Sequence, residues 1–133
     1  MKKEIIFEKL KLLLKNAYVP YSKFPVSCIV FLKDGTEVRG VNVENAAFPS
    51  GICAERVALP QVFAMGYNKN DIESLAIMTS SKGFGSPCGM CRQFMSELFD
   101  KNVDIEMFNI DKYLGKFTID DFLPYQFSSK ELK

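Results

Sequence analysis

Apolar side chains near the start of the chain recur at the spacing of one helical face. The pattern predicts an amphipathic helix that ends before Pro20 and the turn residues Tyr21-Ser22. Its apolar positions are Ile6, Leu10, Leu13, Leu14 and Ala17.

Two β-rich segments follow, over residues 26–33 and 36–43. Asp34-Gly35 lies between them, and this dipeptide favours the tight turn of a β-hairpin. The two segments are therefore predicted to form a pair of strands, followed by a loop that contains Pro49 and Gly51.

The helical pattern returns at Cys53 and ends near Gly66, a residue suited to a helix C-terminus. Pro60 falls inside this second helix. Because proline has no N–H group, we expect a bend between Arg56 and Pro60 and an Arg56 carbonyl that lacks its helical partner.

The rest of the chain predicts a buried strand over 72–79, a loop over 80–87, a third helix that starts near Pro87, and a strand over 103–108. A short strand near Phe117 and a helical turn near Asp120 complete the pattern. The order α-β-β-α-β-α-β predicts an α/β fold, a three-layer α-β-α sandwich with a central mixed sheet. The chain has 133 residues and no repeat or linker, so residues 1–133 are predicted to form a single domain.

The charges give no sign of a nucleic-acid-binding face. The net charge is +1 and residues of both signs are interspersed. No uninterrupted apolar run resembles a signal peptide or a membrane span, so we expect a cytoplasmic protein with no membrane contact.

The chain has four cysteines and no histidine. The absence of histidine excludes every catalytic triad and zinc site that needs an imidazole. In a cytoplasmic chain, a metal-binding or catalytic role for cysteine outranks a disulfide. Cys28 lies in a strand among apolar neighbours and is predicted to be a buried, small hydrophobic residue.

The other three cysteines stand at the predicted starts of two helices, in Cys53-Ala54-Glu55-Arg56 and Pro87-Cys88-Gly89-Met90-Cys91. A helix N-terminus favours the thiolate, which is the metal-binding form. Three thiolates would leave a tetrahedral zinc ion one open position, as in catalytic zinc sites. Glu55 lies two residues from Cys53 and could move protons to and from a water molecule there.

Three thiolates make such a site electron-rich, and a neighbouring cation would offset their charge. Arg56 is the first candidate for this thiolate charge compensation and Arg92 is the second. For each arginine, an ordinary surface ion pair is an equally good interpretation.

These motifs resemble the cytidine deaminase family, in its small homotetrameric, three-cysteine zinc branch. The resemblance covers nearly the whole chain. It includes Ala17-Tyr18-x-Pro20-Tyr21-Ser22-x-Phe24, Asn42-x-Glu44-Asn45-Ala46, both cysteine motifs, and Leu123-Pro124 with Phe127-Ser128.

The resemblance implies a hydrolase that deaminates cytidine and deoxycytidine to uridine and deoxyuridine in pyrimidine salvage, with one zinc ion per subunit. It implies that Cys53, Cys88 and Cys91 bind zinc, that Glu55 moves protons, and that Ala54 and Glu55 contact the amide edge of the base. Phe24 would stack on the pyrimidine, and Asn42 and Glu44 would hold the ribose. Phe48 and Phe127 would enter the pockets of neighbouring subunits of a homotetramer.

The chain departs from the family pattern at three places. Ser27-Cys28 stands where the family usually has small residues such as Gly-Ala, and Pro60 falls inside the second helix. Phe48 replaces a more usual tyrosine, so any contact of that hydroxyl is lost. Without the resemblance, Phe24 would be interpreted as core and Asn42 with Glu44 as strand-end capping.

Four other functions remain open at this point. A deaminase of a cytosine-bearing antibiotic would share the zinc motifs, whereas an editing deaminase would need a polynucleotide-binding surface. A structural zinc module would need a fourth ligand. A redox dithiol protein would use Cys88 and Cys91 but leave Glu55 without a role.

Overall fold

The computed structural model describes residues 2–132 and contains a five-stranded sheet in the order β2-β1-β3-β4-β5. The strands are β1 (Val26–Leu32), β2 (Glu37–Val41), β3 (Ile72–Thr79), β4 (Asp104–Phe108) and β5 (Tyr113–Phe117). Only β3 and β4 pair in parallel, and the other neighbours are antiparallel. The predicted mixed sheet and hairpin are confirmed.

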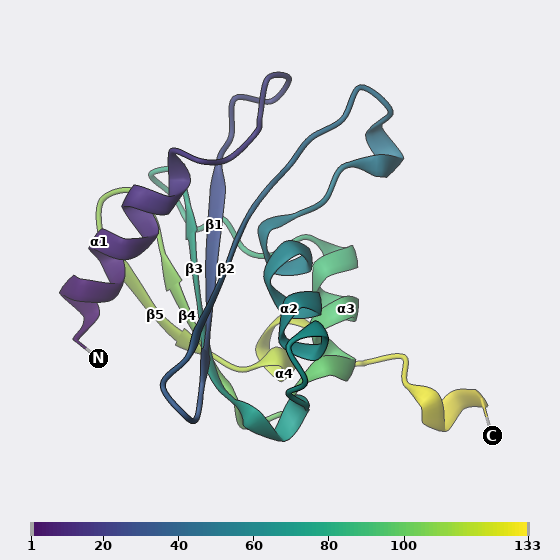
Figure 1. Cartoon of the computed structure of the whole chain (residues 1–133). Helices are drawn as coiled ribbons and strands as arrows, with labels where there is room; N and C mark the ends of the chain where they lie inside the picture. Colours follow the sequence, from purple (N-terminus) through teal and green to yellow (C-terminus); the bar gives the residue numbers. More distant parts are fainter. Residues whose placement is uncertain (1, 133) are drawn as a thin grey trace.

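Helices cover both faces of this sheet, which gives the predicted three layers (Figure 1). Helix α1 (Lys3–Leu14) lies on one face, and α2 (Ala54–Ala64), α3 (Gly89–Leu98) and α4 (Ile119–Phe122) lie on the other. Three 3₁₀ turns complete the described elements, at Phe48–Ser50, Lys69–Asp71 and Ser129–Leu132. In the described part of the chain, no helix is both long and apolar enough to cross a membrane.

The sheet separates two apolar cores. The face under α1 buries Ile6, Leu10, Leu14, Ile29, Ala76, Met78 and Phe108. The larger core lies under α2 and α3 and includes Cys28, which is fully buried as predicted. Burial raises the pKa of the Cys28 thiol well above its usual range, and the negative charge of Glu55 adds to the shift.

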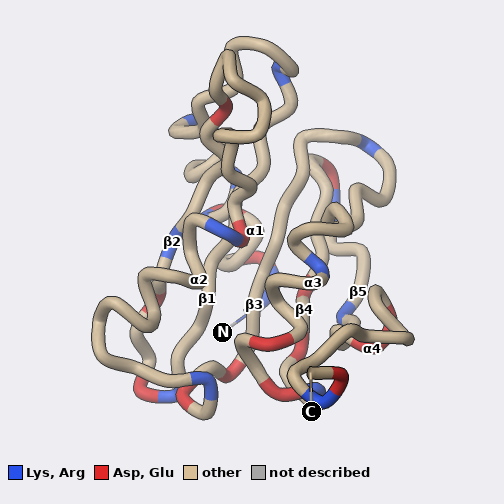
Figure 2. Tube along the Cα trace, turned by 90° about the vertical axis from the view of Figure 1, so that its right-hand side faces the viewer, with Lys and Arg blue, Asp and Glu red and all other residues tan. Residues whose placement is uncertain are grey.

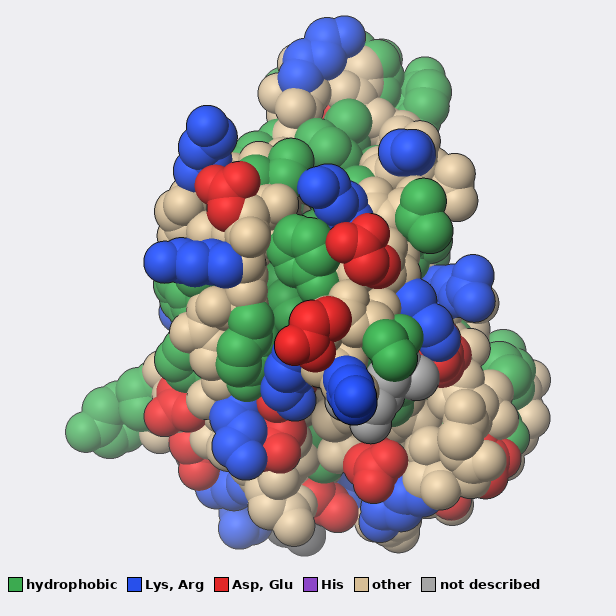
Figure 3. Space-filling model, turned by 90° about the vertical axis from the view of Figure 1, so that its left-hand side faces the viewer, with side chains coloured by type: hydrophobic (Ala, Val, Ile, Leu, Met, Phe, Trp, Pro, Cys, Tyr) green, Lys and Arg blue, Asp and Glu red, His purple; other side chains and the backbone are tan. Residues whose placement is uncertain are grey.

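Charged residues of both signs are distributed over the molecule, as the sequence predicted. Positions of both signs are scattered along the trace, and the face that carries α1 shows a similar mixture around its apolar side chains (Figures 2 and 3). One ion pair anchors α1 to the sheet, because Lys3 Nζ lies 2.6 Å from a carboxylate oxygen of the buried Glu106.

Helix α2 continues through Pro60 without interruption. The side chain of Pro60 is exposed, so its ring does not disturb the core. The Arg56 carbonyl still lacks the usual helical donor, since proline has no N–H group. The bend expected between Arg56 and Pro60 stays a prediction.

The start of α2 packs directly against the backbone of β2 at Gly40. A side-chain carbon at this position would lie 2.7 Å from the Ala58 nitrogen and would also collide with the Ala54 carbonyl. The glycine is needed for this close approach and not for a special backbone angle. Gly40 therefore sets the height of α2 above the sheet, and with it the position of Cys53 and Glu55.

We predict that Gly40→Ala lowers the free energy of unfolding by about 1–3 kcal/mol, the usual cost of overpacking a tight contact. Gly83→Ala is the matched control, because a side-chain carbon there meets no atom within 4 Å. Chemical denaturation of both variants measures the difference. Equal stability of the two variants would contradict the packing argument.

Candidate active site

Helices α2 and α3 begin close together, and their first residues form a cluster of three thiols. Cys53 and Cys88 occupy the N-cap positions of α2 and α3, and Cys91 lies in the first turn of α3. Their sulfur atoms all lie within 4.8 Å of one another, and the Sγ atoms of Cys53 and Cys88 are 3.7 Å apart. The predicted convergence of the three cysteines is present in the structure.

This geometry fits a zinc ion. Zinc–sulfur bonds of about 2.3 Å in a tetrahedron place two sulfur atoms about 3.8 Å apart, whereas a disulfide would need about 2.05 Å. Neither N-cap cysteine makes a side-chain capping hydrogen bond, so both sulfur atoms are free to bind a metal. Among residues 2–132, these three are the one group of cysteine and acidic residues placed to hold a metal ion.

The cluster favours a thiolate even before a metal binds. The pKa of Cys53 is lowered to about 6, chiefly because the Cys91 thiol donates a hydrogen bond to it. The Cys88 thiol and the positive charge of Arg56 act in the same direction. The same hydrogen bond raises the pKa of the Cys91 thiol, so Cys53 is the first thiolate and zinc binding must displace the proton that Cys91 retains.

Glu55 lies in the first turn of α2, beside the thiols, and is only 3% exposed. Burial raises the pKa of its carboxyl group. A carboxyl group with a raised pKa takes up and returns a proton more readily near neutral pH. Burial thus favours the neutral form of this carboxyl group, and the proton-transfer role of Glu55 stays a prediction.

A cavity of about 280 Å³ opens in front of Cys53 and Glu55, close to the lower limit of about 300 Å³ for small-molecule sites. Segments 16–25 and 42–52 project beyond the edge of the sheet and contribute to it (Figure 1). Its lining contains Ser22, Phe24, Val26, Asn42, Glu44, Cys53, Ala54, Glu55, Ile77, Thr79, Gly85, Ser86, Pro87 and Cys88. Most of the residues that the sequence singled out thus meet in one cavity.

Glu44 is held as an ionised acceptor at the mouth of this cavity. Its carboxylate accepts hydrogen bonds from the backbone N–H groups of Tyr21 and Ser22, both at 3.1 Å, and from the Ser22 hydroxyl. These bonds, led by that of the hydroxyl, lower the pKa of Glu44. Ser22 belongs to the motif Ala17-Tyr18-x-Pro20-Tyr21-Ser22-x-Phe24. Its contact with Glu44 joins two segments that lie far apart in the sequence, so residue spacing could not predict it.

Asn42 lines the cavity and also has a structural role that the sequence did not predict. Its Oδ1 accepts from the Val26 N–H at 2.8 Å, and its Nδ2 donates to the Phe24 carbonyl at 2.9 Å. The amide thereby fixes the backbone on both sides of Pro25 and positions the Phe24 ring. One N–H of Nδ2 remains for a ligand.

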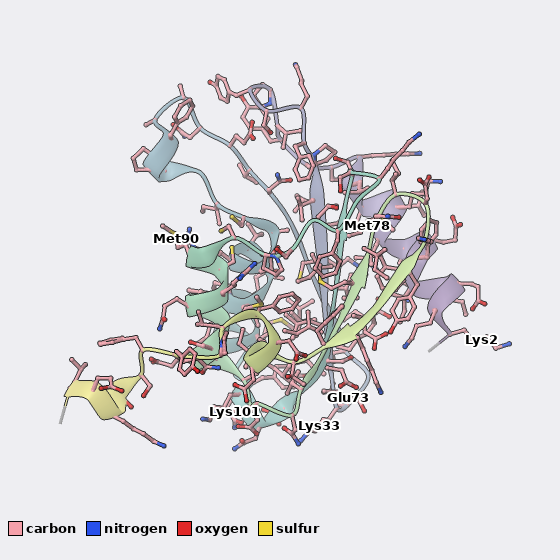
Figure 4. The ribbon with its side chains drawn as sticks, turned by 180° about the vertical axis from the view of Figure 1, so that it is seen from behind. Lys2, Lys33, Glu73, Met78, Met90 and Lys101 are labelled. Carbon is pink, nitrogen blue, oxygen red and sulfur yellow. The ribbon has the colours of Figure 1, made fainter. Side chains whose placement is uncertain are left out.

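The two arginines near the thiols are not equivalent. Arg56 donates from Nη1 to the Met90 sulfur at 2.8 Å, and its guanidinium lies over the Phe94 ring at 5.9 Å. Met90 is labelled at the start of α3 in Figure 4. Arg56 thus makes no direct hydrogen bond to a thiolate, although its charge still lowers the pKa of Cys53.

Arg92 binds the segment that leads to Cys88. It donates from Nε to the Pro87 carbonyl at 2.7 Å, from Nη2 to the Ser86 hydroxyl at 2.8 Å, and from Nη1 to the Phe122 carbonyl at 2.9 Å. It therefore fixes the residues just before Cys88 and joins them to the end of α4. Neither surface ion pairing nor direct contact with a thiolate describes this role.

Phe48 and Phe127 do not line the cavity of their own chain. They are 78% and 57% exposed, respectively. Phe48 lies on the projecting segment, and the Phe127 carbonyl accepts a hydrogen bond from Gln93 on α3.

Comparisons with known proteins agree with this geometry. Residues 1–107 match the family model "Cytidine and deoxycytidylate deaminase zinc-binding region". A cytidine deaminase of Halalkalibacterium halodurans is 35% identical over 118 residues, which cover 89% of this chain and 88% of that protein. One of Mycoplasma genitalium is 36% identical over 120 residues, with coverage of 90% and 91%. A crystal structure of cytidine deaminase from Burkholderia pseudomallei superposes with a TM-score of 0.89 at 34% identity, covering 96% of this chain and 100% of that one.

We predict that Arg92→Gln accelerates zinc loss to a competing chelator by about 10–100-fold, the usual effect of removing a group that orients metal ligands. Arg92→Lys keeps the charge but not the three-way geometry, and its rate should be intermediate. Arg39→Gln, in strand β2, is the control. Zinc loss from Arg92→Gln at the rate of the control would show that the three contacts do not support the site.

Proposed function

Because this chain belongs to the family of cytidine and deoxycytidylate deaminases, we propose that it hydrolyses the exocyclic amine of both cytidine and deoxycytidine. The products are uridine or deoxyuridine and ammonia, formed with one water molecule. The observation that carries this proposal is the cluster of three thiols at two helix starts, with the buried Glu55 beside it, opening onto one small cavity.

In this proposal Cys53, Cys88 and Cys91 hold one zinc ion per subunit. When bound, zinc supplies a Lewis acid that lowers the pKa of a water molecule to about 7. The chain's own contribution to the chemistry is Glu55. Its carboxylate takes one proton from the attacking water and transfers it to N3 of the pyrimidine. It then takes the second proton, from the hydroxyl group now at C4, and delivers it to the amine, which departs as ammonia as the C4 carbonyl forms.

The base lies with its amide edge toward the start of α2. The Ala54 backbone and the Glu55 carboxyl contact N3 and the neighbouring carbonyl, and both residues line the cavity. Phe24 lines the same cavity and stacks on one face of the ring. Stacking excludes water and holds the pyrimidine plane in a fixed orientation.

The sugar is recognised at the mouth of the cavity. Glu44 is an ionised acceptor, so it binds a ligand that donates, such as a ribose hydroxyl. The free N–H of Asn42 complements the oxygen of the same hydroxyl. Glu44 and Asn42 are the two residues through which we propose that the enzyme binds a nucleoside sugar.

The charge of the cavity favours a nucleoside over a nucleotide. The described residues that line it include Glu44 and Glu55 but no Lys or Arg. A phosphate group would meet a carboxylate with no compensating cation, at a cost of unpaired like charges. The same argument disfavours a polynucleotide, and a place in pyrimidine salvage in the cytoplasm is consistent with a free nucleoside substrate.

We further propose that residues 1–133 act as one domain in a homotetramer. The support is the exposure of Phe48 and Phe127, which lie outside the cavity of their own chain. Exposed aromatic side chains are unfavourable in water and typical of protein interfaces. In the assembly, both residues would close the cavities of neighbouring subunits.

A purely structural zinc site is the main alternative, and it would need a fourth protein ligand. The one remaining thiol is that of Cys28, which is buried in the core and is not part of the described cysteine cluster. The observation that favours catalysis is therefore the set of three ligands at the end of an open cavity.

We predict that the purified protein removes the ultraviolet absorbance band of cytidine, whereas Glu55→Gln does not. The substitution should lower kcat by at least about 100-fold, because general acid–base catalysis typically contributes a factor of 10²–10⁴. Zinc is quantified in both proteins as the control, and equal zinc content is expected.

If both proteins bound zinc and neither acted on cytidine or deoxycytidine, the nucleoside assignment would fail. The antibiotic or structural functions would then be preferred.

We also predict that subunits lacking different parts of the site complement each other. Glu55→Gln and Phe127→Ala are each expected to be poorly active alone. When they are mixed, unfolded and refolded together, about one quarter of the sites should combine an intact Glu55 with a partner's intact Phe127, if subunits assort at random. Activity that stays at the mean of the two parents would contradict a shared site.

A further inference from the structure

One wall of the cavity has no role in the proposed reaction. It consists of Ile77 and Thr79 at the end of β3 together with residues 85–87 of the loop before α3. In the sheet order, β3 lies beyond β1 from β2, whereas α2 packs on β1 and β2. Thr79 and residues 85–87 therefore lie on the β3 side of the cavity, whereas Glu55 lies on the α2 side, near Cys28 of β1.

The proposed function fixes which edge of the base meets this wall, and the inference rests on that function. C4 must face the thiol cluster, N3 must face Glu55, and N1 must point to the sugar site at Glu44. A pyrimidine ring has one remaining edge, C5–C6. It lies opposite N3, so C5 faces the wall that contains Thr79.

Thr79 and Gly85 pack tightly in this wall. A side-chain carbon at Gly85 would lie 2.7 Å from Thr79 Oγ1 and 2.8 Å from Thr79 Cγ2. The threonine side chain already occupies the place that a larger residue at position 85 would take. Both residues line the cavity, so the volume they share also determines how much room the ligand has.

The Thr79 side chain is held in place. It is 4% exposed, and its hydroxyl pairs with the Ser81 hydroxyl at 3.0 Å. The loop itself is fixed by Asn109, whose Nδ2 donates to the Lys82 carbonyl at 2.9 Å. Because the Thr79 side chain and the following loop are both held by hydrogen bonds, this wall cannot easily move away from a larger ligand.

We propose that the Thr79–Gly85 pair is a specificity determinant that restricts the substituent at C5 of the pyrimidine. The unsubstituted base fits, and a cytidine with a methyl group at C5 meets the Thr79 side chain. The ratio of kcat/KM for 5-methylcytidine to that for cytidine measures this restriction directly. A change in general stability would affect both substrates alike and leave the ratio constant.

The test uses Thr79→Ala, Gly85→Ala and the double variant, with Gly83→Ala in the same loop as control. Thr79→Ala should raise the ratio about 10-fold or more, because one methylene or methyl group in a pocket is worth roughly 10–200-fold. Gly85→Ala should lower the ratio. The double variant should return toward the wild-type ratio, because the new methyl group enters the space that threonine leaves.

A second measurement does not depend on turnover. The affinities of uridine and 5-methyluridine are compared by calorimetry in the same variants, and Thr79→Ser replaces Thr79→Ala if the latter does not fold. The affinity ratio should follow the same order. A ratio within twofold of wild type in the Thr79 variants, for both turnover and binding, would overturn the proposal.

Failure of the proposed function gives a different result. In that case the wild-type protein would neither deaminate cytidine nor bind uridine. A protein that deaminates cytidine but shows no change of ratio retains its function and refutes only the role of Thr79 and Gly85.

Discussion

The candidate site depends on one constraint: helices α2 and α3 must begin next to each other on the same face of the sheet. Three sulfur atoms lie within 4.8 Å of one another only because α2 and α3 start side by side. The close contact of Gly40 with α2 fixes the position of that helix. The three hydrogen bonds of Arg92 fix the position of the segment that leads into α3. The positive ends of both helices also favour thiolates at this point.

The layers and most element boundaries could be predicted because they follow from local patterns. The strand over 72–79 was predicted with the bounds it has, and the hairpin at Asp34-Gly35 was found from turn chemistry. The convergence of Cys53, Cys88 and Cys91 was predicted because each motif places its ligands within one helical turn. The resemblance to a known family then supplied the pocket residues that spacing alone leaves ambiguous, such as Phe24.

The contacts between distant segments could not be predicted. Arg92 directly follows Cys91 and Arg56 lies three residues after Cys53, yet Arg92 fixes a loop whereas Arg56 contacts the Met90 sulfur. Asn42 was expected to contact the sugar, and its two hydrogen bonds to the backbone around Phe24 are an additional role that the sequence did not indicate. Such roles depend on which loop lies beside a side chain, and no period or spacing in a sequence encodes that.

Segment 16–25 connects the proposed sugar-binding site with the proposed base-binding site. Ser22 donates to Glu44 and accepts from the Phe24 N–H at 3.1 Å. It thereby connects the carboxylate that we propose binds the sugar with the residue whose ring we propose stacks on the base. A ligand without a sugar makes no contact with Glu44, so it gains nothing from the carboxylate that Ser22 connects to the Phe24 backbone. Binding energy from a remote hydroxyl is thereby available to orient the reacting ring, so free cytosine should turn over slowly even at saturation.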